Sequence, residues 1–233
     1  MSSFLITGDS WGLGEWTVRE HSVQPAGLMS RYITHSGLHY YLEQEGHQVT
    51  NISHAGQSNK VITRLLKLHL ETHSNYDYII WFQTDPLRDL RPYTKSFTKL
   101  TTNNELIHNR NILLNDTYTL LNSLNKTIHC IGGCSKLNVD AIQTCANLIP
   151  IIPSVIELCL PEFIQPLISF SDWINFIPKD FKDFDELITI KKNLDLFYTK
   201  PVYQKYFWPD GSHVNRYGHK IIFDKVCDTL GLT

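Results

Sequence analysis

Short apolar runs alternate along the chain with longer stretches in which apolar residues recur at helical spacing. A short run bounded by polar or glycine residues is typical of a buried strand, whereas a longer periodic stretch is typical of an amphipathic helix. The segments expected to form strands are residues 4–6, 48–53, 78–82, 127–131 and 149–156. Those expected to form helices are residues 27–45, 59–73, 104–124 and 215–230. Pro150 and Pro153 place the last strand at the edge of a sheet.

This alternation of strands and helices predicts the fold class. Strands separated by helices form βαβ units, in which helices cover both faces of a parallel sheet. We therefore expect an α/β fold. No repeat, linker or low-complexity tract divides the chain, so residues 1–233 are expected to form a single domain. Residues 157–209 interrupt the alternation and are rich in aromatic side chains, which predicts an insertion or cap over one end of the sheet.

The composition excludes several classes of protein. Hydrophobic residues make up 42% of the chain and charged residues 19%, which excludes an intrinsically disordered chain. The formal net charge is -2 and basic residues do not cluster, so no binding to nucleic acid or to a membrane is expected. No apolar run reaches the roughly 18 residues of a membrane-spanning helix, and the first residues lack the pattern of a secretion signal. We therefore expect a cytoplasmic protein.

The cysteines give no sign of a disulfide framework or of a metal site. They are five in number, which is odd, and no two have the Cys-x-x-Cys spacing of a structural zinc site. We expect buried free thiols at Cys130, Cys134, Cys145, Cys159 and Cys227. No metal ion or other cofactor is expected.

A serine follows the first predicted strand, within the segment Gly8-Asp9-Ser10-Trp11-Gly12. Sites in parallel α/β sheets form outside the carboxyl ends of the strands, so Ser10 is placed where a nucleophile would lie. The segment also matches the Gly-x-Ser-x-Gly motif of α/β-hydrolases, but that fold requires several strands before its serine and only nine residues precede Ser10. The alternative is a turn in which the serine caps a helix. Asp9 is expected to be a structural cap.

A histidine suited to act as the base for this serine lies near the end of the chain. Asp210 precedes His213 by three residues, just before the last predicted helix. A carboxylate bonded to one ring nitrogen fixes the tautomer, so that the other nitrogen can accept the serine proton. The same spacing also occurs where an aspartate merely caps a helix.

Two further residues at the carboxyl ends of predicted strands can donate hydrogen bonds to a developing oxyanion. Gly56 follows the second strand and offers an unobstructed backbone N–H, and Thr84 follows the third and offers a hydroxyl. Preorganised donors of this kind give a large gain in the rate of acyl transfer.

Together these segments resemble the SGNH hydrolases, also known as the GDSL esterase and lipase superfamily. The resemblance is carried by Gly8-Asp9-Ser10 with Gly14, by Gly56, by Asp210-Gly-Ser-His213 and by the Gly218-His219 pair that follows. It implies a flavodoxin-like, three-layer αβα sandwich with strand order 2-1-3-4-5. It also implies a triad of Ser10 as nucleophile, His213 as general base and acid, and Asp210 as its orienting partner. The implied oxyanion donors are the backbone N–H groups of Ser10 and Gly56.

The third motif departs from the pattern of that superfamily. The motif usually reads Gly-x-Asn-Asp, with the asparagine amide as third oxyanion donor, whereas this chain has Phe82-Gln83-Thr84-Asp85. Thr84 is then the expected third donor, although its hydroxyl is shorter than an amide and can rotate away. Asn59 and Gln83 are the alternative donors, and Phe82 in place of glycine narrows the site.

The sequence therefore predicts a serine esterase that hydrolyses carboxylic esters through an acyl-enzyme. An acyltransferase would use the same triad, and the weakened oxyanion hole favours a third reading, a non-catalytic binding module on the same scaffold. The expected partner is a small-molecule ester or an acylated sugar. The residues expected in its pocket are Trp11, Asn59, Gln83 and Trp208, although Trp11 fits a core position equally well.

Overall fold

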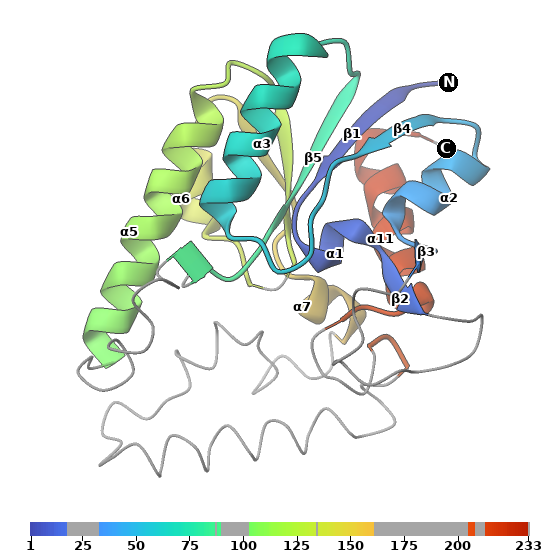
Figure 1. Cartoon of the computed structure of the whole chain (residues 1–233). Coiled ribbons are helices and arrows are strands. Elements are labelled where there is room, and N and C mark those ends of the chain that lie inside the picture. Colours follow the sequence, from blue (N-terminus) through green and yellow to red (C-terminus); the bar gives the residue numbers. More distant parts are fainter. Residues whose placement is uncertain are drawn as a thin grey trace.

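The structure of the protein, a computed structural model, describes residues 1–17, 33–86, 88–89, 103–133, 135–160, 205–207 and 213–232 (Figure 1). Its strands are β1 (Ser3–Thr7), β2 (Glu15–Thr17), β3 (Ile33–His35), β4 (Gln48–Asn51), β5 (Tyr78–Gln83), β6 (Ile128–Gly132) and β7 (Leu148–Ile152). Its helices are α1 (Ser10–Leu13), α2 (Leu38–Gln44), α3 (Asn59–Thr72), α5 (Asn103–Asn122), α6 (Val139–Gln143), α7 (Val155–Cys159) and α11 (Arg216–Leu230).

Five of the strands form one parallel sheet in the order β4-β1-β5-β6-β7. Numbered along the chain within this sheet, that order is 2-1-3-4-5, which confirms the expected topology. In the register of the sheet, Leu5 of β1 lies between Thr50 of β4 and Ile79 of β5. Because all pairs are parallel, the carboxyl ends of the strands meet at a single edge of the sheet.

Helices cover both faces of this sheet, with α3, α5 and α6 on one side and α2 and α11 on the other (Figure 1). Successive side chains of a strand point to opposite faces, and β1 shows the consequence. Phe4 and Ile6 belong to the core cluster that contains residues of α2 and α11, whereas Leu5 belongs to the cluster that contains residues of α3 and α5. Burial on both faces explains why β1 and β5 read as continuous apolar runs. The predicted three-layer αβα sandwich is therefore confirmed.

One predicted helix is wrong over part of its length. The pattern predicted a helix over residues 27–45, of which residues 27–32 lie outside the described part of the chain. Residues 33–35 instead form β3, which pairs in antiparallel fashion with β2, and α2 begins only at Leu38. Ser36 has a φ of 52°, in the left-handed region, and this conformation interrupts a right-handed helix. The helix therefore starts only after Gly37, its N-cap residue.

The last strand is shorter than predicted. A strand was expected over residues 149–156, but β7 ends at Ile152 and α7 begins at Val155. The Ser154 side chain caps α7 by accepting a hydrogen bond from the Glu157 N–H, which fixes the change from strand to helix. β7 does lie at the edge of the sheet, as its prolines predicted. The short helix α6 has no counterpart among the predicted elements.

The remaining expectations are only partly covered by the described residues. Residues 161–204 and 208–212 lie outside them, so the single domain and the cap over residues 157–209 stay predictions. Of the five thiols expected to be buried and free, Cys130, Cys159 and Cys227 are both, Cys145 is free but only half-buried, and Cys134 lies outside the described residues. Among the described helices, none is long and apolar enough to cross a membrane.

Candidate active site

Ser10 lies at the carboxyl end of β1, where the chain turns into the short helix α1. β1 is an inner strand that ends at Thr7, and Ser10 is the first residue of α1. Asp9 is the N-cap of this helix, and its Oδ1 accepts a hydrogen bond from the Trp11 N–H at 3.0 Å. The prediction that Asp9 acts as a structural cap is therefore confirmed, and the serine sits at the edge of the sheet where sites form.

Two glycines allow the turn around Ser10 to pack closely against its neighbours. A Cβ atom at Gly8 would lie 2.7 Å from the Cβ of Phe82, and one at Gly12 would lie 2.5 Å from the Oγ of Ser53. Both distances are too short for two non-bonded heavy atoms. The glycines of the motif therefore let α1 approach β5 and the segment after β4.

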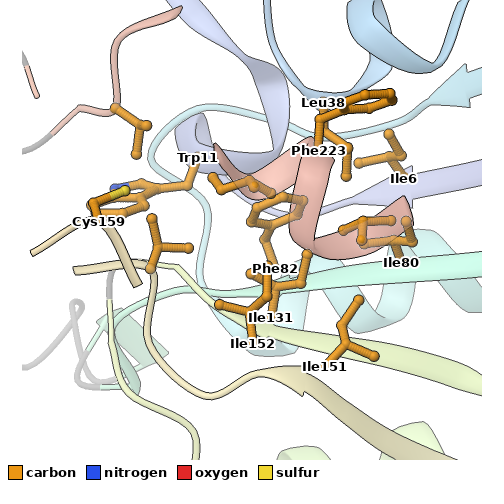
Figure 2. Close-up of a cluster of buried hydrophobic side chains, with 14 of the residues drawn as sticks. Ile6, Trp11, Leu38, Ile80, Phe82, Ile131, Ile151, Ile152, Cys159 and Phe223 are labelled. Atoms are coloured by element: carbon orange, nitrogen blue, oxygen red, sulfur yellow. The ribbon is translucent and has the colours of Figure 1, made fainter. Parts of the chain in front are cut away.

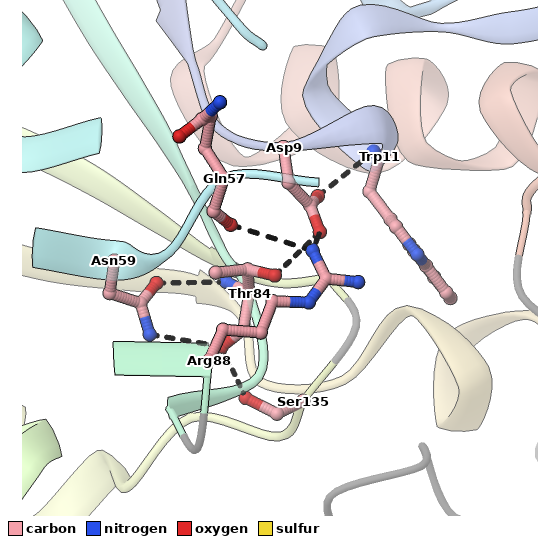
Figure 3. Close-up of polar contacts among 7 residues, drawn as sticks. All are labelled: Asp9, Trp11, Gln57, Asn59, Thr84, Arg88 and Ser135. Carbon is pink, nitrogen blue, oxygen red and sulfur yellow. Dashed lines mark hydrogen bonds and ion pairs between the residues drawn. The ribbon is translucent and has the colours of Figure 1, made fainter. Parts of the chain in front are cut away.

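The second carboxylate oxygen of Asp9 accepts hydrogen bonds from two side chains that follow β5 (Figure 3). Thr84 Oγ1 donates to Asp9 Oδ2 at 2.6 Å, and Arg88 Nη1 donates to the same oxygen at 2.7 Å. Asp9 is 0% exposed, and a buried carboxylate is costly unless it is paired and hydrogen-bonded. Sequence reasoning missed Arg88, because a single arginine in a loop carries no signal of its distant partner.

The side chain and the backbone of Thr84 are both hydrogen-bonded within the protein. Its single hydroxyl proton goes to Asp9, as the 2.6 Å bond shows. Its backbone is held by Asn59, whose Oδ1 accepts from the Thr84 N–H at 2.9 Å and whose Nδ2 donates to the Thr84 carbonyl at 3.0 Å. Both residues are 0% exposed. In this arrangement, the Thr84 hydroxyl and one amide proton of Asn59 are already engaged within the fold.

Replacement of Thr84 by valine separates a structural role of its hydroxyl from the oxyanion role that the sequence predicts. Thr84→Val keeps the β-branched shape, and we expect it to lower the free energy of unfolding by about 1.5–3 kcal/mol, because a buried hydrogen bond to a charged group is lost. The kcat for p-nitrophenyl acetate is expected to stay within about twofold of the wild-type value, since no oxyanion donor is removed. Urea denaturation and steady-state kinetics on the same variant test this. A fall in kcat of about tenfold or more at unchanged stability would support the oxyanion role instead.

Gln83 is a core residue whose hydrogen-bonding groups are used within the protein. It is 0% exposed. Its Nε2 donates to Ser135 Oγ at 2.6 Å and to the Lys136 carbonyl at 2.8 Å, and its Oε1 accepts from the Tyr118 hydroxyl at 2.6 Å. Both amide protons are therefore engaged. Gln83 therefore does not line a pocket in this structure, and it has no amide proton left to donate to an oxyanion.

Trp11 also belongs to the core. The sequence left open whether it is a core residue or a pocket wall, and the structure places it at 3% exposed within the apolar cluster of Figure 2. The centroid of its ring lies 5.9 Å from that of Phe207. Of the four residues expected in the pocket, Asn59, Gln83 and Trp11 are thus buried, and Trp208 lies outside the described residues.

The segment that carries His213 is connected to the segment that carries Ser10 through two contacts. Val214, the residue after His213, forms an antiparallel bridge with Phe207. Phe207 in turn packs against Trp11, the residue after Ser10. His213 itself is 8% exposed. The two candidate catalytic residues, far apart in sequence, therefore lie on neighbouring segments of the structure.

The other two predicted site residues remain untested. Asp210 lies outside the described residues, so its bond to His213 stays a prediction. Gly56 lies in the loop between β4 and α3 with a φ of 71°, a left-handed conformation that favours glycine. A Cβ atom there would meet no heavy atom within 4 Å, so the backbone conformation accounts for the glycine and crowding does not. Its role as an oxyanion donor stays a prediction.

A second histidine, His219, is fully buried near His213. Neither of its ring nitrogens has a well-formed hydrogen bond. Burial lowers the pKa of its imidazole to about 3, against a smaller opposing effect of the Gly14 backbone. The rings of His39 and His213 lower the pKa of His219 further, because a protonated His219 would be repelled by positive charge on those two rings.

In the part of the chain that the structure describes, no three His, Cys, Asp or Glu side chains lie together as a metal site requires.

The buried His219 predicts a loss of stability in acid. Its pKa is lowered in the folded state, so the unfolded chain takes up its proton first, near the ordinary value of 6.5. Stability from this group is complete above that pH and is lost as the pH falls toward 3. Between pH 7 and pH 5 we expect the loss to be about 2 kcal/mol. His219→Leu should remove this part of the pH dependence in urea titrations, and an unchanged dependence would contradict the assignment.

No family model and no curated protein matches the chain. Solved structures match over nearly its whole length. The lipase Lip_vut3 from a goat rumen metagenome is 14% identical with a TM-score of 0.48, and the match covers 98% of this chain and 97% of that one. The esterase EstA from Pseudoalteromonas sp. is 13% identical with a TM-score of 0.46, covering 99% of this chain and 97% of that one. A third match, from Veillonella parvula, is 12% identical with a TM-score of 0.43 and covers 98% of each chain. That protein is described as a member of the lipolytic G-D-S-L family, the family that the sequence motifs of this chain resemble.

Proposed function

We propose that the protein is a serine esterase that hydrolyses a small carboxylic ester through an acyl-enzyme on Ser10. One observation supports the proposal most: Trp11, the residue after Ser10, contacts Phe207, which forms a bridge with Val214, the residue after His213. Ser10 also lies at the carboxyl end of an inner strand of a parallel sheet, where such folds build their sites.

In the acylation step, the Oγ of Ser10 attacks the carbonyl carbon of the ester while His213 accepts the serine proton. The carbonyl oxygen becomes an oxyanion, which the backbone N–H groups of Ser10 and Gly56 are proposed to stabilise. The tetrahedral intermediate collapses, the ester C–O bond breaks, and the alcohol leaves with the proton that His213 returns. Asp210 is the proposed partner that orients the imidazole.

In the deacylation step, His213 takes a proton from water and the resulting hydroxide attacks the acyl carbon. The second tetrahedral intermediate releases the carboxylic acid, and Ser10 regains its proton from His213. An alcohol in place of water would give acyl transfer with the same residues. Small-molecule esters and acylated sugars are the proposed substrates.

A fluorophosphonate probe tests this function directly, because it reacts only with an activated serine. Mass spectrometry is expected to find one adduct, on the peptide that contains Ser10, together with turnover of p-nitrophenyl acetate. A panel of short-chain, long-chain and acetylated-sugar esters, with and without an added alcohol, then separates esterase from transferase. A chain that is neither labelled nor active would favour a non-catalytic binding module.

A further inference from the structure

A buried negative charge lies directly beside the candidate nucleophile. Asp9 precedes Ser10, is 0% exposed, and uses Oδ1 to accept the Trp11 N–H. Its other oxygen pairs with the guanidinium of Arg88 at 2.7 Å, and that side chain is 18% exposed. A charged group at this depth is tolerated only when an opposite charge and hydrogen bonds compensate it. Arg88 therefore supplies the compensating charge that makes Asp9 tolerable as the cap of α1.

The same pair matters for a reaction at Ser10. Attack by a serine on an ester converts a neutral carbonyl into an oxyanion next to α1. An uncompensated carboxylate one residue away would repel that new charge. At the effective dielectric constant of a protein site, a unit charge several ångströms away is enough to slow such a step about 10-fold to 100-fold. The charge on Asp9 must therefore be neutralised for the site to work.

We infer that Arg88 is a positioning residue for this reaction, which acts through Asp9. It neutralises the carboxylate next to Ser10 and holds Oδ2 against the Thr84 hydroxyl (Figure 3). Its Nη1 also reaches the carbonyl of Gln57 at 3.5 Å, a long contact to the residue after Gly56. Arg88 thereby links α1 to the loops after β4 and β5. This inference rests on the proposed esterase function.

The test compares Arg88→Met with Arg88→Lys on p-nitrophenyl acetate. Methionine preserves much of the length and removes the charge, so we expect kcat to fall about 10-fold to 100-fold. KM is expected to stay within about threefold of wild type, because the oxyanion exists only in the transition state. Lysine restores a positive charge beside Asp9 and should keep kcat within about fivefold of wild type. A packing role alone would not produce this dependence on charge.

A second variant guards against a simple failure to fold. Arg88→Met leaves a buried carboxylate unpaired, which destabilises a protein strongly. In the double variant Asp9→Asn with Arg88→Met, both charges are gone and an amide oxygen can still accept the Trp11 N–H. We expect this variant to recover the melting temperature and most of the kcat lost in Arg88→Met. Recovery of stability without recovery of kcat would overturn the inference.

Arg216 offers a matched control. It pairs with Glu15 at 3.0 Å, and Glu15 is 1% exposed, so Arg216→Met also breaks a buried pair. This variant should lose stability as Arg88→Met does, but keep kcat within about threefold of wild type. If Arg88→Met had a kcat as high as that of Arg216→Met, the positioning role of Arg88 would be wrong, but the proposed esterase function would stand. A wild-type protein that is inert toward p-nitrophenyl acetate and fluorophosphonate would instead overturn the proposed function, and the inference with it.

Discussion

Ser10→Ala is expected to reduce the kcat for p-nitrophenyl acetate by about 10³-fold or more. The variant keeps the backbone of α1 and its cap by Asp9, so the fold and the backbone donors survive. What is lost is the oxygen that attacks the ester and carries the acyl group. Without it neither half of the reaction can proceed.

His213→Ala should have a loss of similar size, because Ser10 would then have no base to accept its proton. Residues of a triad act as one unit, so the double variant Ser10→Ala with His213→Ala should be little worse than either single variant. Steady-state kinetics on the three proteins, with circular dichroism to confirm folding, measure this. Losses that multiply in the double variant would show that the two residues act independently.

Ser53 is the matched control for the nucleophile. It is another buried serine, 6% exposed, and its Oγ has no hydrogen-bond partner and lies close to Gly12. Ser53→Ala should retain wild-type kcat and fluorophosphonate labelling, whereas Ser10→Ala should lose both. Full activity in Ser10→Ala together with a loss in Ser53→Ala would move the nucleophile to the other serine.

Much of this fold follows from its hydrophobic pattern. Phe4, Leu5 and Ile6 form a continuous apolar run because β1 is buried on both faces. Runs of this kind are typical of strands in a parallel sheet, so they can be recognised without knowing which strands pair. The pattern failed between residues 33 and 37, where a short strand that pairs in antiparallel fashion with β2 replaces the start of a helix, whereas α2 lies within the predicted range. The three-residue strands of this pair are too short to leave a periodic signal, and the turn at Ser36 depends on one backbone angle.

The candidate site was predictable only as far as local motifs reach. Ser10 and its cap Asp9 follow from the sequence around β1, since strand, turn and helix start lie within one segment. Arg88 is different, because its partner is 79 positions away and the pairing depends on how the loop after β5 runs. Asn59 was expected in a pocket from its place after Gly56, but its amide holds the backbone of Thr84, 25 positions away. Side-chain pairs of this kind are set by the packed structure and leave no trace in spacing.

Gly132→Ala is expected to lower the free energy of unfolding by about 3 kcal/mol, the largest effect on stability that we predict for a single added methyl group. Gly132 ends β6 and pairs with Gln83 of β5. A Cβ atom there would lie 2.0 Å from the Pro153 carbonyl oxygen and 3.1 Å from the Leu137 nitrogen. Those two atoms form a hydrogen bond of 2.9 Å, so the methyl group would push into a backbone contact that no side-chain rotation can relieve.

Gly46→Ala separates this crowding from backbone strain. Gly46 has a φ of 82°, and a Cβ atom added there would meet no heavy atom within 4 Å, so alanine costs only the left-handed conformation, about 1–2 kcal/mol. Urea denaturation of both variants gives the comparison. If Gly132→Ala cost no more than Gly46→Ala, the contact between the end of β6 and the Pro153 carbonyl would have to be looser than the structure has it. A larger cost at Gly132 would show that the end of β6 is packed tightly against the Pro153 carbonyl. The loop that follows β6 carries Ser135 and Lys136, which accept hydrogen bonds from the Gln83 amide, next to Thr84. The free energy of unfolding and the position of Thr84 would then both depend on the backbone of this loop.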